Sequence, residues 1–409
     1  MLVLDHLPTP SQRNIAMHIT PSAERAVRDG HPWLFQNSLR KQSRDGKAGD
    51  LAVIFDKRDR FLAIGLYDPQ SPIRVRVLHQ GSSAKIDDAF FAEKIQQSYD
   101  KRAPIRASDT TGYRLIYGEG DGLSGLIIDC YANVLVIKIY TSAWFAHLKA
   151  IIEGLNVIFP DATLILRLSR LVQDDDTHGL VDGTVIQGDL SSPTVQFHEH
   201  GLTFQADIIE GHKTGFFFDQ RDNRQRVRQL ANGKTVLDVF SYNGGFSVNA
   251  AAGGATQVTS LDISSPALLD AVNNMDLNRH LPTVTDCQHE TIVADAFEGL
   301  AELAQAGTTY DLVIVDPPTF ASRQEQVAGA MIAYEKLVRL ALDVLASSGT
   351  LVMASCSSRV PAEGFFALVH NTAIRAGRPL NEFARTQHAL DHPITFPEGA
   401  YLKCLFATV

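Results

Sequence analysis

The chain has 409 residues, more than one ordinary hydrophobic core holds, so two or three domains are expected. Hydrophobic residues make up 45% and charged residues 20% of the chain, a composition typical of a globular protein and not of a disordered one. The four cysteines lie far apart without metal-ligand spacing, and no segment is apolar enough for a membrane span or a signal peptide. We therefore expect a cytoplasmic protein with reduced thiols and neither a metal site nor a membrane partner.

The charge is distributed unevenly along the chain. The net charge is −9 at pH 7, yet residues 11–110 carry 17 Lys or Arg against 12 Asp or Glu, which leaves −14 for the remainder. A basic N-terminal region on an acidic body is typical of a protein that binds a phosphate backbone at one end. An uneven surface charge without function explains the same numbers, so the charge alone leaves both interpretations open.

The first half of the chain predicts two small units. The earlier unit is β-rich, and in its last strand Arg74 and Arg76 alternate with apolar residues, so both side chains should lie on one face. The later unit, 82–190, mixes strands and a helix, and its acidic stretch 173–179 is typical of an exposed loop. Strands are expected at 51–55, 61–66, 73–78, 126–129, 134–140 and 163–168, and helices at 23–30 and 143–157.

From residue 194 onward, strand and helix patterns alternate regularly, which predicts a parallel, doubly wound sheet. In such a sheet, ligands bind at the carboxyl ends of the strands. Strands are expected at 235–240, 257–262, 291–295, 311–316 and 350–355, with helices at 245–252, 265–278, 297–306 and 325–346.

Acidic residues and a glycine turn mark three of these strand ends. Glycines 244 and 245 let the backbone turn sharply after the first strand and approach a ligand, although a ligand-free turn fits equally well. Asp262, which ends the second strand, can accept hydrogen bonds from both hydroxyls of a ribose. Asp295 falls where an adenine amino group would lie. Together these features predict a cofactor that carries a nucleoside.

Two further motifs follow the fourth and fifth strands. In Asp-Pro-Pro-Thr-Phe (316–320), the prolines fix the loop and hold Asp316 at the mouth of the cleft, although a plain proline turn is the alternative. Ser-Cys-Ser (355–357) should bring Cys356 beside Asp316. A lone cysteine is usually a small buried hydrophobe, but the thiol of Cys356 would face the ligand cleft. Its reactivity would require a pKa below the usual value of about 8.5. The buried interpretation applies to Cys130, Cys287 and Cys404.

The segment 211–224, Gly-His-Lys-Thr-Gly-Phe-Phe-Phe-Asp-Gln-Arg-Asp-Asn-Arg, precedes the first of these strands. It combines three aromatic with five charged residues, which fits neither a core segment nor random surface. An aromatic floor with flanking charges would suit a zwitterionic ligand, such as the methionine end of a cofactor.

Taken together, the motifs resemble the ribosomal large-subunit RNA methyltransferase I family, whose members make 5-methylcytosine in large-subunit ribosomal RNA. The resemblance implies an α/β protein with three parts: a small β-rich PUA-like RNA-binding domain at 17–80, a central α/β domain at 82–190 and a Rossmann-like class I methyltransferase domain at 194–409. Residues 1–16 have no counterpart, and 170–193 fit poorly. The matches are HPWLF (31–35), GLYDPQSPIRVRV (65–77), YRLIYGEGDGLSGLIID (113–129), GHKTGFFFDQRDNR (211–224), VLDVFSYNGGFSV (236–248), DPPTF (316–320), SCS (355–357) and FPEGAYLK (396–403).

The resemblance also implies a cofactor, a partner and roles for single residues. The cofactor is S-adenosyl-L-methionine and the partner is RNA, with Arg74 and Arg76 expected to contact it. Cys356 is the implied nucleophile, and Asp316 has both a catalytic and a cofactor-binding role. The oligomeric state stays open, a homodimer included. The remaining residues implied to bind the cofactor are Phe218, Asp219, Arg221, Asp238, Tyr242, Gly244, Asp262 and Asp295.

The chemistry of cytosine requires a nucleophile of this kind. C5 of a pyrimidine is a poor nucleophile, so its methylation needs a covalent step in which a thiolate adds to C6. Asp316 can bind the N3/N4 edge, and a base that the sequence does not identify removes the C5 proton. A relative with the same Asp-Pro-Pro-Thr-Phe motif methylates guanine and lacks the cysteine, so Cys356 favours cytosine. Two alternatives remain: an RNA methyltransferase for another base or for transfer RNA, with Cys356 structural, and a protein that binds RNA and cofactor without turnover.

Overall fold

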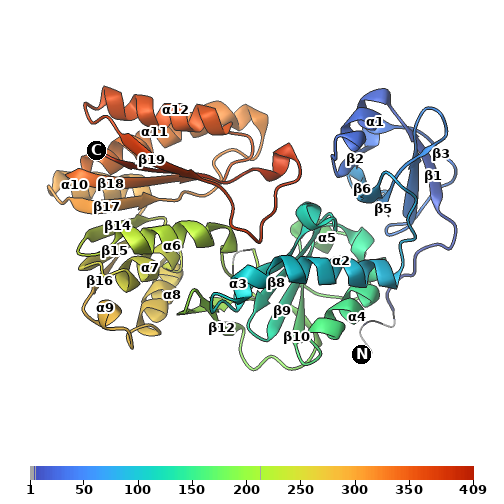
Figure 1. The fold of residues 1–409 in the computed structure, drawn as a ribbon, viewed down its shortest axis with the longest axis horizontal. Coiled ribbons are helices and arrows are strands. Elements are labelled where there is room, and N and C mark those ends of the chain that lie inside the picture. Colours follow the sequence, from blue (N-terminus) through green and yellow to red (C-terminus); the bar gives the residue numbers. More distant parts are fainter. Residues whose placement is uncertain (1–3, 5, 212) are drawn as a thin grey trace. The chain divides into compact units, whose positions relative to one another are not determined.

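The computed structural model describes residue 4, residues 6–211 and residues 213–409. The chain divides into two compact units (Figure 1). In the described ranges, no helix is long and apolar enough to cross a membrane. Unit 1 contains the described residues up to His198 together with Ala206–Phe218 and Leu390–Pro397, and unit 2 contains Glu199–Gln205, Asp219–Ala389 and Glu398–Val409.

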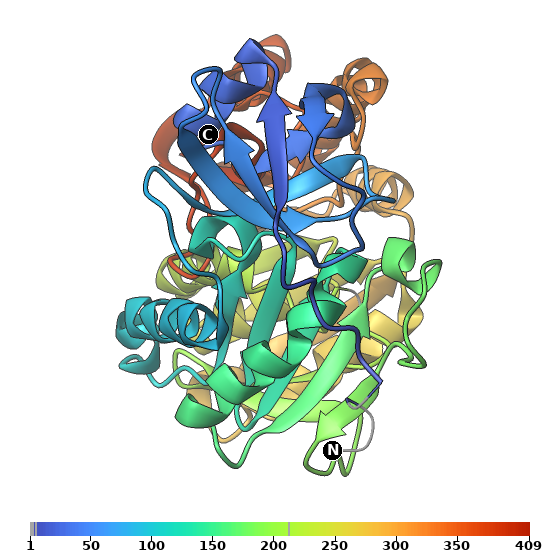
Figure 2. The same cartoon turned by 90° about the vertical axis from the view of Figure 1, so that its right-hand side faces the viewer.

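Unit 1 begins with a six-stranded sheet, drawn in blue in Figure 2, and its strand order is β2-β6-β5-β4-β1-β3. β1 pairs with β4 in parallel, and the other neighbours are antiparallel. Alternate residues of β1 are buried, as expected for a strand with one face on the core. The Thr20 hydroxyl accepts from the Ala23 amide at 3.3 Å and caps α1. The elements are β1 (Ile15–Ile19), α1 (Pro21–Arg28), β2 (Trp33–Phe35), β3 (Leu39–Gln42), β4 (Leu51–Phe55), β5 (Phe61–Tyr67) and β6 (Ile73–Gln80).

The rest of unit 1 is built on a mixed five-stranded sheet in the order β11-β10-β9-β8-β7. Only β9 and β10 pair in parallel. Helices α2 and α4 pack against each other (Figure 2), and Trp144 and Phe91 lie fully buried in the core. The elements are α2 (Asp88–Lys101), α3 (Ala103–Arg106), β7 (Gly112–Tyr117), β8 (Leu126–Tyr131), β9 (Val134–Ile139), α4 (Leu148–Ile158), β10 (Thr163–Leu168), α5 (Arg170–Gln173) and β11 (Thr184–Gln187).

The β-rich part and the central part of unit 1 share polar contacts at Glu119, which lies between β7 and β8. Its carboxylate accepts hydrogen bonds from Trp33 Nε1 at 2.9 Å and from Ser124 Oγ at 2.8 Å. Arg76 Nη1 lies 3.6 Å from the same carboxylate. The Thr141 hydroxyl also donates to Asp68. Because Trp33, Arg76 and Asp68 belong to the β-rich part and Glu119 and Thr141 to the central part, specific hydrogen bonds and an ion pair join these two parts of unit 1.

Unit 2 is built on a seven-stranded sheet in the order β16-β15-β14-β17-β18-β20-β19 (Figure 1). The strands β14 to β18 are parallel to one another, while β20 runs antiparallel to both of its neighbours. The elements are α6 (Arg221–Leu230), β14 (Thr235–Val239), α7 (Gly245–Ala252), β15 (Gln257–Asp262), α8 (Ser265–Asp276), α9 (Pro282–Thr285), β16 (Gln288–Val293), α10 (Ala296–Gln305), β17 (Tyr310–Val315), α11 (Val327–Asp343), β18 (Leu345–Ser355), α12 (Ala362–Arg375), β19 (Asn381–Thr386) and β20 (Lys403–Thr408).

The expected fold class is confirmed, because the five strands predicted from residue 235 onward form a parallel, doubly wound sheet. The pattern did not reveal β19 and β20. Central β20 is almost wholly buried and does not alternate, so its short apolar run carries no strand periodicity. Along the chain, β12 (Thr194–Glu199) and β13 (Leu202–Asp207) follow β11 and form a two-stranded sheet.

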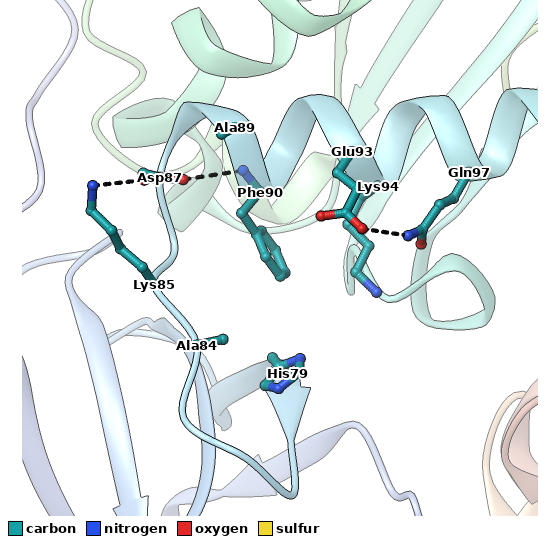
Figure 3. Close-up of a pocket in the computed structure, with 9 residues that line it drawn as sticks. All are labelled: His79, Ala84, Lys85, Asp87, Ala89, Phe90, Glu93, Lys94 and Gln97. Atoms are coloured by element: carbon teal, nitrogen blue, oxygen red, sulfur yellow. Dashed lines mark hydrogen bonds and ion pairs between the residues drawn. The ribbon is translucent and has the colours of Figure 1, made fainter.

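A pocket of about 450 Å³ lies where β6 leads into α2 (Figure 3). The Asp87 carboxylate caps α2 through the Phe90 amide at 3.1 Å and pairs with Lys85 at 2.8 Å. No residue predicted to bind cofactor or RNA is among those that line this pocket, which are His79, Ala84, Lys85, Asp87, Ala89, Phe90, Glu93, Lys94 and Gln97.

Candidate active site

The predicted chemistry gathers at one edge of the unit 2 sheet. Strands β15, β14, β17 and β18 are successive parallel neighbours, so the turns that follow them leave from the same edge. These four turns carry Asp262, the 240–244 segment, Asp316 and Cys356 in that order across the sheet. The structure therefore brings to one edge residues that are distant in sequence, such as Asp262 and Cys356.

The turn after β14 has an unusual backbone. Phe240 (φ 64°), Tyr242 (φ 49°) and Gly244 (φ 77°) all adopt the left-handed region, which is strained for residues other than glycine. A Cβ at Gly244 would come within 2.8 Å of the Ala271 Cβ, so only glycine fits there. Gly244 precedes α7, whose first amides are directed toward this turn. Strain of this kind is typical of ligand-binding turns.

Asp262 ties this turn to the next strand. Its carboxylate accepts the Tyr242 amide at 2.9 Å and the Ser264 amide at 2.9 Å, one on each oxygen. Each oxygen of a carboxylate has a second acceptor position, so both remain able to bind ribose hydroxyls. The neighbouring Ile263 side chain is 70% exposed although it is apolar.

Asp238 and Ser241 place buried polar atoms at this turn, and their hydrogen bonds indicate whether a polar ligand fits there. Asp238 is fully buried, its Oδ2 accepts from Ser247 Oγ at 2.7 Å, and its Oδ1 has no hydrogen-bond partner among the described residues. Burial raises the pKa of this carboxyl to about 7. The buried Ser241 hydroxyl also lacks a partner in the described part of the chain. Buried polar groups are normally hydrogen-bonded, so the two unpaired atoms fit a site completed by a polar ligand.

Asp295 lies two residues beyond the end of β16, not at the strand's last position as the sequence predicts. It caps α10, because its Oδ1 accepts the Phe297 amide at 2.9 Å and the Glu298 amide at 3.4 Å. The acid is therefore fixed at a helix N-terminus through one of its oxygens, and its predicted contact with adenine remains a prediction.

Cys356 differs from the other cysteines in its exposure. It is partly exposed, and its Sγ lies 3.2 Å from Thr319 Oγ1 and 3.5 Å from the Pro317 carbonyl oxygen, both in the Asp-Pro-Pro-Thr loop. Cys130, Cys287 and Cys404 are buried. Burial raises the pKa of Cys130 to about 12 and that of Cys287 to about 11, and it raises the pKa of Cys404 as well. These three thiols remain protonated at neutral pH.

The two serines that flank Cys356 hold its loop. Ser355 Oγ accepts from the Tyr334 hydroxyl at 2.9 Å, and Ser357 Oγ donates to the Ala321 carbonyl at 2.7 Å. Both serines are fully buried. The Ser-Cys-Ser segment thus presents one side chain, the thiol, while its neighbours fasten the backbone.

The 211–224 segment contributes to both units. His212 lies outside the described residues. Phe218 belongs to unit 1, where its ring packs at 5.1 Å from that of Tyr131 and 5.5 Å from that of Phe216. Asp219 belongs to unit 2, where its Oδ2 accepts from the Tyr401 hydroxyl at 2.6 Å.

Arg221 begins α6 and is fully buried. Its Nε lies 3.8 Å from the Glu199 carboxylate, which also accepts a bidentate pair from Arg224 at 2.7 and 2.5 Å. The side chains of Phe218, Asp219 and Arg221 thus all contact other protein groups, and their predicted contacts with the cofactor remain predictions.

The two arginines expected to contact RNA have different surroundings. Arg74 is partly exposed, and its guanidinium donates to the Pro69 carbonyl. The Arg76 side chain is only 8% exposed and lies against Glu119, and burial lowers the pKa of its guanidinium. A buried, ion-paired guanidinium is not free to reach a phosphate, so an exposed phosphate contact is not supported for Arg76.

In the part of the chain that the structure describes, no cluster of three metal-ligating side chains occurs.

Comparison with known proteins agrees with this geometry. A family model described as S-adenosylmethionine-dependent methyltransferase matches residues 123–407, and a model of a PUA-like domain matches residues 17–80. Among solved structures, a protein of Streptococcus mutans described as SAM-dependent methyltransferase has a TM-score of 0.81 at 24% identity. SMU.776 complexed with SAH has a TM-score of 0.81 at 25% identity. Each match covers 96% of this chain and 100% of the other.

Three curated relatives are similar over almost the whole chain. A ribosomal RNA large subunit methyltransferase of Deinococcus radiodurans is 47% identical, and the alignment covers 98% of each chain. Ribosomal RNA large subunit methyltransferases I of Photobacterium profundum and of an Enterobacter species are 36% and 35% identical, over 95% of this chain and 98% of theirs. The strand-end acids, the strained glycine turn and this similarity together show that the chain belongs to the S-adenosylmethionine-dependent methyltransferases, in the ribosomal RNA large subunit methyltransferase I family.

Proposed function

We propose that this protein transfers the methyl group of S-adenosylmethionine to C5 of a cytosine in large-subunit ribosomal RNA, with Cys356 as the nucleophile. The observation that carries the proposal is the partly exposed Cys356 thiol at the carboxyl end of β18, beside the loop that begins at Asp316. The names of the relatives support the class of RNA.

S-adenosylmethionine supplies an electrophilic methyl group. In the proposed site, Asp262 binds the ribose hydroxyls and Asp295 the adenine amino group. The turn with Tyr242 and Gly244, backed by buried Asp238, binds the methionine end. The unpaired atoms Asp238 Oδ1 and Ser241 Oγ support this orientation, because the charged amino group of the methionine end could donate a hydrogen bond to either oxygen. Phe218, Asp219, Arg221 and Asp316 complete the proposed binding residues.

The proposed reaction follows from the poor nucleophilicity of C5. The Cys356 thiolate forms a bond to C6, and the electron pair displaced to C5 takes up the methyl group. A base then removes the C5 proton, and the electrons of that C–H bond expel the thiolate. Asp316 hydrogen-bonds the N3/N4 edge and favours protonated N3, which assists the addition and distinguishes cytosine from uracil. The products are 5-methylcytosine, the demethylated cofactor and a proton.

We further propose that the chain has three domains with different functions. Residues 17–80 position the RNA, and residues 194–409 carry out methyl transfer. Residues 82–190 connect these two domains and support them. The PUA-like match to residues 17–80 supports the first assignment. Phosphate contacts confer affinity without base choice, whereas contacts in the catalytic pocket select the base.

The first experiment is transfer of labelled methyl from the cofactor to total RNA, followed by nucleoside analysis of the separated ribosomal and transfer RNAs. The expected product is 5-methylcytosine in the large ribosomal RNA. Label in another nucleoside, or in transfer RNA, would replace this proposal with a methyltransferase of different specificity. No incorporation into any RNA by a protein that binds the cofactor would indicate a binding protein.

The second experiment tests the nucleophile. With 5-fluorocytosine at the target position, C5 has no proton to lose, so the adduct should survive denaturing electrophoresis. Cys356→Ala should form no adduct and lose methylation, while it still binds cofactor. Cys287→Ala is the matched control, because Cys287 is buried and lies outside the loop. Normal methylation by Cys356→Ala would contradict the proposed mechanism.

A further inference from the structure

Lys403 is a buried cation whose partners are neutral. It is the first residue of β20, lies opposite Ser355 of β18 and is 2% exposed. Its Nζ donates to the carbonyl oxygens of Ser357, of Val360 at 2.9 Å and of Tyr401 at 3.1 Å. Within the described residues, no carboxylate lies within ion-pair distance of this ammonium group. Burying a charge without a counter-ion costs free energy of folding. A function of Lys403 that outweighs this cost is therefore expected.

The position of Lys403 indicates what that role is. Two of its three acceptors belong to the backbone that directly follows Cys356, so the ammonium fastens the 357–360 segment next to the thiol. Burial lowers the pKa of Lys403 to about 8, and negative charge on Cys356 raises it again. Because Nζ donates to the carbonyl oxygen of Ser357, the residue after Cys356, the ammonium group and the thiol belong to the same small loop region.

We propose that Lys403 is a positioning residue for Cys356: it orients the loop that carries the thiol and stabilises the thiolate by its positive charge. The assignment deepens the proposed function, since it rests on Cys356 as the nucleophile. A nearby cation is a general means of increasing the thiolate fraction of a cysteine. The thiol would then be ready for addition to C6 without a separate general base.

Three other titratable groups of this part of the sheet, Asp316, Tyr334 and Cys404, do not carry a positive charge that would stabilise the thiolate. Asp316 follows β17, and its negative charge raises the pKa values of the Tyr334 hydroxyl and of the Cys404 thiol. Tyr334 of α11 faces both Asp316 and Cys356, but burial raises the pKa of its hydroxyl, which stays neutral. Cys404, next to Lys403, is buried and its pKa is raised as well. Among these groups Lys403 is the one with a positive charge, so it can offset the negative charge of Asp316.

The test measures the thiol directly. The alkylation rate of Cys356 by iodoacetamide is followed against pH, with the rate of Cys356→Ser subtracted. In the wild-type protein, the apparent pKa should lie below about 8.5, the ordinary value for cysteine. Lys403→Gln keeps hydrogen-bond donors near the loop carbonyls but removes the charge. It should raise the apparent pKa by about one unit, which is about a tenfold slower alkylation at pH 7.

Two variants and one binding measurement complete the design. Lys403→Arg retains the charge and should restore most of the wild-type pH profile. Lys234→Gln removes a charge at the opposite, amino end of β14 and should leave the profile unchanged. Calorimetric cofactor binding reports whether each variant is folded. The proposal is overturned if the apparent pKa of Cys356 in the wild-type protein is at or above about 8.5, a result that requires no variant. It is also overturned if the pH profile of alkylation is unchanged in folded Lys403→Gln. Because alkylation of the thiol needs no RNA, a failure of the Lys403 proposal can be distinguished from a failure of the proposed methyl transfer.

Discussion

At the scale of single residues, Asp262 is held in place before any ligand binds, because two backbone amides fix its carboxylate. Asp262→Ala should weaken S-adenosylmethionine binding by about 1.5–3 kcal/mol, since the variant has no charged hydrogen-bond acceptor for the two hydroxyls. Isothermal calorimetry measures the change. Asp276→Ala, which removes an exposed acid from α8, is the control. Unchanged affinity in a folded Asp262→Ala protein would remove Asp262 from the site.

Asp238 makes a second prediction at this scale, concerning pH. Its pKa is raised to about 7 in the folded chain, above an unfolded value of about 3.9, so the folded state binds more protons between these values. Its contribution to stability is therefore favourable below pH 4 and is lost as the pH rises through 7. Asp238→Asn should remove this dependence. The difference in unfolding free energy between wild type and variant should change by a few kcal/mol, of order 1.4 per pKa unit, between pH 4 and 8. Urea titrations of the cofactor-free proteins at pH 4 and pH 8 measure this difference. If the interpretation is wrong, the difference in unfolding free energy will be the same at the two pH values.

At the scale of elements, the junction between β14 and α7 depends on one glycine. Gly244→Ala should destabilise the protein by about 2–3 kcal/mol, because an alanine there is strained at positive φ and meets Ala271. Gly329, on α11, has open space around it and lies within a helix. Gly329→Ala should instead stabilise by about 0.5–1 kcal/mol. Denaturant unfolding of both variants distinguishes the two effects, and equal changes would contradict the strain at Gly244.

At the scale of the whole molecule, the basic N-terminal region should bind RNA through its exposed cations. Arg40 and Lys41 are exposed on β3, at the edge of the six-stranded sheet, whereas Arg76 is buried. Arg40→Glu with Lys41→Glu should weaken RNA binding and reduce the slope of log affinity against log salt by about 0.7–0.9 for each phosphate that is no longer neutralised. Cofactor affinity should be unaffected. Filter binding at several salt concentrations tests this, and an unchanged affinity and slope would exclude this edge as the RNA-binding surface.

Deleting residues 1–80 is a poor alternative test, because Trp33 and Arg76 both contact Glu119 of the central part. Removing them would leave the Glu119 carboxylate without two of its partners, which is destabilising for a partly buried acceptor. Arg76→Glu should likewise destabilise the protein, since it would place a carboxylate against that of Glu119 in a buried position. Thermal unfolding of Arg76→Glu would show the effect as a lower midpoint, and an unchanged midpoint would contradict the internal role of Arg76.

Local pattern determined a large part of this protein. The strand–helix alternation after residue 194 predicts the parallel sheet, because strand and helix periods are properties of neighbouring residues. The strand ends then locate Asp262, Asp316 and Cys356 on one edge, since parallel strands share a direction. The glycines of the turn after β14 predict its sharp backbone for the same local reason.

Only the tertiary structure decided how buried each group is and what it touches. Arg76 alternates with apolar residues like Arg74, yet Glu119, 43 positions later in the sequence, makes it an internal ion pair. Asp238 lies inside a strand, and only packing shows that one of its oxygens is unpaired among the described residues. Lys403 reaches the Cys356 loop through an antiparallel strand pair that no periodicity predicts. Burial and long-range pairing depend on chain segments distant in sequence, so they are fixed when the sheet assembles and not by local residue preference.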